Sequence, residues 1–234
     1  MEPEETGIYQ LMMNLPLFNG AGFNKMSEIL AFSHFTFKRH EHGDVIIRTG
    51  EVCDSIIFIL KGRVRSTITT NDARVAVSQT LQAPDILSPD FLFGLNTESP
   101  ATVVADGYAA TAWLGKSDYL RILNTDNIFL FNFLNRLSKD AQKAIDGLLS
   151  LNGGSIEQRL AFWISALTDP SGIDIVMEGK NREVYTMFGA QRSVFIQSMQ
   201  NLEQQGLISY SPGIIRVTDR RSLIKETLPG LGIQ

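Results

Sequence analysis

The spacing of hydrophobic and polar residues changes several times along the chain and predicts a series of distinct segments. Residues 15–34 carry apolar side chains at loose helical spacing, which predicts a short helical lead-in. Residues 35–115 contain short β-branched runs, such as DSIIFILKGRVRSTITT, that are separated by Gly, Asp or Pro. Runs of this kind predict a compact antiparallel barrel or sandwich.

A seam of apolar residues is the clearest periodic signal, on a helix predicted from about Asn127 to Leu151. Spacings of four and three residues alternate along it over three heptads, as in two helices that pack along an a/d stripe. The seam consists of Leu130, Leu134, Leu137, Ala141, Ala144, Leu148 and Leu151. The pattern predicts a dimerisation helix, and an ordinary core helix is the alternative. Other apolar residues lie off the seam and are expected to pack on the barrel: Phe129, Phe131, Phe133 and Ile145.

The sequence NGGS at 152–155 breaks this helix and predicts a flexible hinge, with Ser155 as the N-cap of the next helix. The segments that follow have the order strand, helix, turn at Gly189, helix and hairpin around 212–213. This order predicts a winged helix-turn-helix. We therefore expect an α+β chain in three parts, namely a β-barrel domain over 1–126, a dimerisation helix over 127–152 and a winged helix-turn-helix domain over 153–234.

The second helix of this motif is predicted to have two faces. One side is expected to pack inward and holds Val194, Phe195, Ser198, Met199 and Leu202. The other side is free to reach a groove of nucleic acid and holds Gln191, Arg192, Ser193, Gln197 and Gln200.

The chain has 234 residues, 44% of them hydrophobic, and a formal net charge of −4 that arises entirely in its N-terminal part. Residues 1–152 hold 13 Lys and Arg against 17 Asp and Glu, whereas residues 153–234 hold 8 against 8. A net negative charge argues against a nucleic-acid binder, because phosphate contacts need cations. A neutral C-terminal domain can still bind DNA when its basic residues share one face.

The first residues are acidic where a secretory signal needs basic ones, and no stretch reaches about 18 consecutive apolar residues. We therefore expect a cytoplasmic protein without a membrane partner. The single cysteine, Cys53, excludes an internal disulfide and cannot alone supply the ligands of an iron–sulfur cluster or a structural zinc ion. It is expected to be a small buried thiol.

Three stretches of the chain follow a shared pattern. The barrel carries G-x-x-x-D-S-I-I-F-I-L-K-G-R-V from Gly50 to Val64, and Gln158-Arg159-Leu160-Ala161 follow the hinge. The C-terminal part carries Glu183, Gly189, Arg192, Leu202-Glu203 and Gly206-Leu207-Ile208, with Phe195 and Met199 in place of the more usual valine and leucine. In this order and spacing, the stretches resemble the cyclic-AMP receptor protein and Fnr (CRP/Fnr) superfamily of bacterial transcription regulators.

The resemblance implies a jelly-roll (double-stranded β-helix) effector domain, a helix that pairs two subunits, and two recognition helices that enter a palindromic operator. The base-reading positions of the family fall on Arg192, Ser193 and Gln197, and Arg can read guanine while Gln reads adenine. Candidate phosphate contacts are Gln191, Lys180 and Arg182. The implied partners are double-stranded DNA, a second copy of the chain, RNA polymerase and an unknown small-molecule effector.

The cyclic-nucleotide cassette of the family is absent from this sequence. A gapless alignment of Leu81 to Ala105 places Pro89 at the glutamate that holds the ribose, and Ser99-Pro100 at the Arg-Ser pair that neutralises the phosphate. On the dimer helix, the polar pair that contacts adenine becomes Ala144-Ile145. A buried phosphate without a cation would cost several kcal/mol. We therefore expect that cyclic AMP is not the effector.

The expected walls of the effector pocket are apolar, so that either a hydrophobic small molecule enters or side chains fill the space. They comprise Ile86, Leu87, Phe91, Leu92, Phe93, Ala144, Ile145 and Leu148. An Fnr-type oxygen sensor needs four cysteines, and haem would need a ligand from His34, His40, His42, a methionine or Cys53. His40 and His42 are expected to lie in a polar surface loop.

A metal-dependent cupin enzyme is the alternative from another class, because it shares the barrel and His40-x-His42 imitates the start of its metal site. That site also needs a carboxylate three to five residues further on and a later histidine, yet residues 45–47 are apolar and no histidine follows His42. We expect no metal, no cofactor and no enzymatic activity. A regulator that needs no effector and acts mainly through protein partners is the other alternative.

Overall fold

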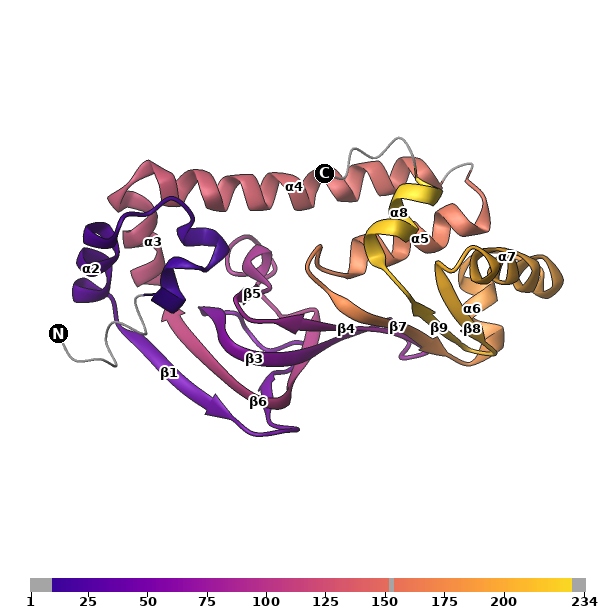
Figure 1. Cartoon of the computed structure of the whole chain (residues 1–234), viewed down its shortest axis with the longest axis horizontal. Coiled ribbons are helices and arrows are strands. Elements are labelled where there is room, and N and C mark those ends of the chain that lie inside the picture. The colour runs from indigo at the N-terminus through magenta and orange to yellow at the C-terminus, as the bar shows by residue number, and fades with distance from the viewer. Residues whose placement is uncertain (1–9, 152–153, 229–234) are drawn as a thin grey trace. The chain divides into compact units, whose positions relative to one another are not determined.

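The computed structural model describes residues 10–151 and 154–228, apart from the side chains of 143–151 (Figure 1). These residues form two compact units. The described part of the first unit comprises 10–64 and 82–140, and that of the second comprises 65–81 and 141–228. The hairpin at 65–81 therefore belongs to the unit that contains the C-terminal residues.

The first unit consists of antiparallel strands and the helices packed against them. Its elements are η1 (Pro16–Phe18), α2 (Phe23–Phe32), β1 (Phe35–His40), β2 (Val45–Ile47), the first part of β3 (Ser55–Thr69), β5 (Asp85–Leu87), η2 (Pro89–Phe91), β6 (Ala101–Gly115), α3 (Lys116–Thr125) and most of α4 (Asn127–Leu151). β6 pairs with β1 and β2, and β3 pairs with β5, all antiparallel. Alternate residues of β6 are buried at its start, as expected of a strand with one face on a core. The predicted β-rich region over 35–115 is confirmed.

The helical lead-in predicted over 15–34 is present, but it is not continuous. It consists of the short η1 and then α2, which begins only at Phe23. Gly20 separates them with a φ of +84°, a left-handed conformation that suits glycine and interrupts a helix. Met26 and Ile29 are buried as their spacing indicates, but Phe23 is 43% exposed because it stands in the first turn of α2.

Aromatic side chains join the start of α4 to the core of the first unit. Phe18 contacts Phe58 and Phe129 with ring centroids 5.5 and 5.8 Å apart, and Phe133 is buried in the same cluster. The expected packing of Phe129 and Phe133 is therefore confirmed. The expectation for Phe131 is wrong, since this side chain is 59% exposed. Two residues along a helix correspond to about 200° of rotation, which turns Phe131 away from its neighbours.

The second unit combines a sheet with helices. Its elements are the end of β3, β4 (Val75–Gln82), the end of α4, α5 (Ile156–Leu167), β7 (Ile173–Gly179), α6 (Asn181–Met187), α7 (Arg192–Gln204), β8 (Ile208–Ser211), β9 (Ile214–Val217) and α8 (Arg220–Thr227). Its strands have the order β4-β7-β9-β8. The pairing of β4 with β7, in which Val77 lies opposite Met177, was not anticipated from the sequence. The predicted strand, helices and hairpin after residue 170 are confirmed as elements.

The start of α5 confirms Ser155 as an N-cap. The hydroxyl of Ser155 accepts a hydrogen bond from the backbone N–H of Gln158 at 3.2 Å, and the Gln158 side chain accepts one from the Ser155 N–H at 3.0 Å. Together they form a capping box, which satisfies backbone donors at the start of the helix. Residues 152–153 of the predicted hinge lie outside the described residues.

The core of the second unit is apolar and also contains one buried cation. Leu160, Ile164, Phe195 and Met199 are fully buried, and they form one cluster with Val75 and Val77 of β4. The guanidinium of Arg220 is enclosed nearby, where its Nε donates to the hydroxyl of Thr168 at 2.9 Å and its Nη2 to the carbonyl of Ser165 at 3.2 Å. These hydrogen bonds replace the solvation that burial removes from the charge.

Candidate nucleic-acid interface and pocket

A tight turn joins α6 to α7. Gly189 has a φ of +62°, and the N–H of Ala190 donates to the carbonyl of Tyr185 at 3.2 Å. Arg159 of α5 stabilises the turn, because its Nη1 donates a hydrogen bond to the carbonyl of Phe188 at 2.8 Å. The turn thus ends α6 and fixes the residue at which α7 begins.

α7 has one buried face and one exposed polar face. Phe195, Ser198, Met199 and Leu202 are buried, as the sequence predicted. Arg192, Ser193 and Gln197, together with Gln200, are exposed. Val194 was expected on the buried side but is 49% exposed. The buried stripe starts only at Phe195, so Val194 adds an apolar surface beside Arg192 and Ser193.

The candidate phosphate contacts lie at the beginnings of α6 and α7. Lys180 is the N-cap of α6, Arg182 stands in its first turn, and both are exposed. Gln191 is the exposed N-cap of α7 and makes no side-chain capping bond. The first N–H groups of a helix have no hydrogen-bond partner within the helix. Those of α7 can therefore donate hydrogen bonds to an anion such as a phosphate.

The residues expected to line an effector pocket in the barrel are placed only in part. Ile86 and Leu92 are 1% exposed and belong to the apolar cluster of the first unit, Leu87 is buried and Phe91 is half-buried. The half-buried Phe93 packs against the same cluster. Ala144, Ile145 and Leu148 lie among the side chains that are outside the described residues. The pocket therefore stays a prediction.

The segment at the position of the phosphate cassette has no cation. Residues 81–105 contain no lysine or arginine. The hydroxyl of Ser99 is buried and donates to the carbonyl of Ala101 at 2.8 Å, and Pro89 is buried at the start of η2. Because that hydroxyl already serves a backbone carbonyl, Ser99 has no free donor for a phosphate.

The prediction that His40 lies in a surface loop is wrong. His40 ends β1 and is 8% exposed, and its Nε2 is hydrogen-bonded to the hydroxyl of Thr111 at 2.9 Å. Burial lowers the pKa of its imidazole below the usual value. His42 is exposed on the following turn, where its Nδ1 accepts from the N–H of Gly107 at 3.1 Å. The two rings thus have separate structural partners.

Among the described residues, no group of three or more His, Cys, Asp or Glu side chains is arranged to hold a metal ion. Cys53 is buried as predicted, and burial raises the pKa of its thiol. In the same part of the chain, no helix combines the length and apolar character needed to cross a membrane.

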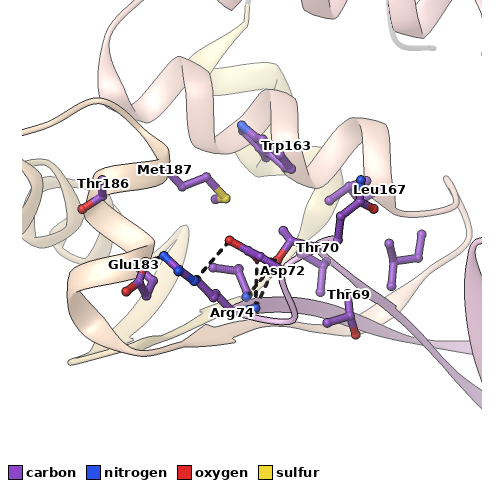
Figure 2. Close-up of a pocket in the computed structure, with 13 residues that line it drawn as sticks. Thr69, Thr70, Asp72, Arg74, Trp163, Leu167, Glu183, Thr186 and Met187 are labelled. Atoms are coloured by element: carbon purple, nitrogen blue, oxygen red, sulfur yellow. Dashed lines mark hydrogen bonds and ion pairs between the residues drawn. The ribbon is translucent and has the colours of Figure 1, made fainter.

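A pocket in the second unit was not predicted from the sequence (Figure 2). Its volume is about 690 Å³. The β3–β4 hairpin, α5 and α6 contribute its lining, which consists of Ile68, Thr69, Thr70, Asn71, Asp72, Arg74, Val75, Val77, Trp163, Leu167, Glu183, Thr186 and Met187. No periodic signal could have found it, because the hairpin stands far from α5 and α6 in the sequence.

Charged groups cluster on one side of this pocket. The Nη1 of Arg74 donates to the carboxylate of Glu183 at 3.1 Å, and the Nε of Arg74 lies 3.4 Å from the carboxylate of Asp72. The hydroxyl of Thr70 donates to Asp72 at 2.6 Å, and this hydrogen bond is the main cause that lowers the pKa of the Asp72 carboxyl. The hairpin turn therefore presents a charged carboxylate and a guanidinium side by side.

The seam of α4 exposes apolar side chains where they are described. Leu130 and Leu134 are 36% and 44% exposed, Leu137 is half-buried and Ala141 is exposed. The side chains of Ala144, Leu148 and Leu151 lie outside the described residues. Leucines left exposed at heptad spacing are typical of a surface that a second helix covers.

Comparisons with known proteins agree with this architecture. Residues 37–126 match the cyclic nucleotide-binding domain family. The cAMP-activated global transcriptional regulator Vfr of Pseudomonas aeruginosa is 25% identical over 193 residues, which are 78% of this chain and 88% of the relative. The catabolite activator protein of Thermus thermophilus has a TM-score of 0.50 at 20% identity, over 92% of this chain and 99% of that one. The sensor domain of the regulator DNR from Pseudomonas aeruginosa has a TM-score of 0.54 at 18% identity, over 62% of this chain and 95% of that one.

The fold and these matches define a mixed helix and sheet protein that carries a cyclic nucleotide-binding β-sandwich. The chain is thus similar to the CRP/Fnr superfamily of transcription regulators, as its sequence motifs indicated. Vfr is named as a transcriptional regulator, and similarity to it favours a regulator over the cupin alternative.

Proposed function

We propose that the chain is a homodimeric, sequence-specific DNA-binding transcription regulator whose winged helix-turn-helix consists of α6, α7 and the β8–β9 hairpin. The observation that carries this proposal is the division of α7 into a buried apolar face and an exposed face with Arg192, Ser193 and Gln197. A helix anchored in this way can enter the major groove without unfolding its own core.

The exposed face of α7 suits a half-site with both guanine and adenine. Arg192 can bind the O6 and N7 of guanine through two hydrogen bonds, and Gln197 can bind the N6 and N7 of adenine. Val194 supplies an apolar surface that fits a thymine methyl group. Lys180, Arg182 and Gln191 are proposed to contact phosphates and to set the register of the helix on the duplex.

Dimerisation along α4 would present two such helices to a palindromic operator, with half-sites about one helical turn apart. The exposed Leu130 and Leu134 support this arrangement. We keep the division into a jelly-roll effector domain over 1–126, a dimerisation helix over 127–152 and a DNA-binding domain over 153–234. The pairing of β6 with β1 and of β3 with β5 suits a jelly roll. A regulator of this kind acts in the cytoplasm and contacts RNA polymerase.

We infer that cyclic AMP is not the effector, although Vfr is named as a cAMP-activated regulator. Residues 81–105 lack any lysine or arginine, and the Ser99 hydroxyl is engaged by the carbonyl of Ala101. A cyclic phosphate at this position would find no cation within the segment to neutralise it. Calorimetry with cyclic AMP should therefore show no micromolar binding, and a micromolar dissociation constant would overturn this part of the proposal.

The decisive experiment measures binding to duplex DNA selected by the protein from a random-sequence pool, over a series of salt concentrations. Arg192→Ala should weaken binding to the selected site by about 1–3 kcal/mol for each guanine that Arg192 reads, and it should relax the selection at those positions. Arg221→Ala is the matched control, because Arg221 is exposed on α8, outside α6 and α7.

Four possible results would distinguish the competing functions. Loss of specificity with Arg192→Ala alone supports the proposal, and equal loss with both variants shows binding by charge only. Absence of any selected sequence, with and without an extract of small metabolites, favours the alternative of a regulator that works through protein partners. Selection only with the extract indicates an effector, which fractionation would then identify.

A further inference from the structure

We propose that the pocket between the β3–β4 turn, α5 and α6 is a binding site for a small amphipathic organic cation, with an aromatic or branched apolar body and a single ammonium group. All lining residues belong to the second unit. The site is separate from the barrel position expected for an effector, and the proposal does not depend on DNA binding.

The apolar part of the pocket has the size and composition of a small-molecule site. Its volume of about 690 Å³ falls in the range of pockets that bind drug-sized ligands. Trp163 and Leu167 of α5 face it together with Met187 of α6, and all three are half-buried (Figure 2). Val75 and Val77 extend the apolar wall along β4. The indole of a tryptophan can stack on a ring of the ligand, and the flexible thioether of a methionine can adjust to the ligand's shape.

The polar part of the pocket selects the sign of the ligand's charge. Two carboxylates, Asp72 and Glu183, stand against one guanidinium, Arg74, which contacts both. The polar side of the lining therefore carries one net negative charge. An ammonium group placed there balances this charge, whereas an anion would have to displace a carboxylate from Arg74. The face of Trp163 adds a second feature that attracts cations over anions.

The turn holds its carboxylate in place before any ligand binds. The hydroxyl of Thr70 donates to Asp72 at 2.6 Å, and the backbone N–H of Arg74 donates to the same carboxylate oxygen at 3.2 Å. The N–H of Thr70 also donates to the carbonyl of Val75 at 2.8 Å across the base of the turn. A preorganised acceptor costs less to order on binding.

The test uses a matched pair of probes, 4-phenylbutylamine and 4-phenylbutyrate, which share an apolar body and differ in charge. Calorimetry on the full chain should show the amine saturating one site at about 1 mM or below, the range expected of a fragment-sized ligand. The carboxylate should bind at least about tenfold more weakly. Intrinsic fluorescence should change with the amine, because Trp163 lines the pocket.

Asp72→Asn should weaken binding of the amine about threefold to tenfold, because it removes one carboxylate and leaves the shape of the side chain. Asp106→Asn, which makes the same change in the first unit, should leave the affinity unaltered. Absence of binding by the amine, equal affinities for the two probes, or an unchanged affinity in Asp72→Asn would each overturn the proposal. DNA is absent from these measurements, so their outcome is independent of the proposed function.

Discussion

The guanidinium of Arg74 donates a hydrogen bond to the carboxylate of Glu183 at 3.1 Å, although the two residues are 109 positions apart in the sequence. Arg74 ends the β3–β4 turn, and Glu183 lies in the first turn of α6. Beside this contact, Val75 and Val77 of β4 pair with β7 and enter the core of the second unit. The hairpin is therefore joined to α6 by a charged contact and to the sheet by main-chain pairing and apolar burial.

The pair of Arg74 and Glu183 should add only modestly to stability. The two side chains are 59% and 27% exposed, and solvent screens such pairs to about 0.2–1 kcal/mol. We expect a double-mutant cycle of Arg74→Ala and Glu183→Ala, measured by urea unfolding, to give a coupling energy in this range that falls as salt is added. The 3.6 Å pair of Arg63 and Asp106 provides the reference cycle in the first unit. A coupling near zero at low salt would contradict the assigned contact.

The contrast between α4 and the hairpin shows what the sequence can and cannot predict. The bounds of α4, from Asn127 to Leu151, follow from the apolar period and from the glycines after it, and both signals are local. The pairing of β4 with β7 depends on which strands become neighbours in the folded chain. The spacing of apolar residues within either strand does not contain that information. The pocket beside the hairpin was missed for the same reason.

The faces of α7 illustrate a smaller limit. The apolar stripe predicted the buried set from Phe195 to Leu202, but it also included Val194, which is exposed. A stripe of apolar residues has no sharp border, and only the packing partners decide where it ends. His40 shows the converse, because a polar sequence context predicted exposure while a hydrogen bond to Thr111 allows burial.

Breaking the α4 seam should separate the proposed dimer. Leu134→Asp places a charge on a leucine that is 44% exposed in the single chain, so the fold of the monomer should survive while a paired helix would have to bury the charge. Sedimentation is expected to shift from dimer to monomer. Leu95→Asp is the control, because this fully exposed side chain stands outside α4. A dimer that persists in Leu134→Asp would contradict the seam.

The buried imidazole of His40 should make stability depend on pH. Burial lowers its pKa from the usual 6.5, so the folded state resists a proton that the unfolded chain accepts. The stabilisation is complete above about pH 6.5 and is lost as the pH falls towards the folded pKa. Urea unfolding between about pH 7.5 and 5.5 should show this decline in the free energy of unfolding, and His40→Gln should reduce the slope. His42→Gln is the control for an exposed ring, and an equal reduction in that variant would sink the assignment.

Two glycines of the second unit allow two effects of an alanine substitution on stability to be distinguished, namely backbone strain and a steric clash of the new Cβ. Gly206, after α7, and Gly213, in the β8–β9 turn, have φ values of +73° and +86°, so alanine is strained at both by about 1–2 kcal/mol. A Cβ at Gly206 would meet nothing within 4 Å, whereas a Cβ at Gly213 would collide with the carbonyl oxygen of Gly179 on β7. That oxygen belongs to the backbone and cannot move away without disturbing the sheet. Gly213→Ala should therefore lower the free energy of unfolding clearly more than Gly206→Ala does in urea titrations, and equal losses would show that the hairpin does not approach β7 so closely.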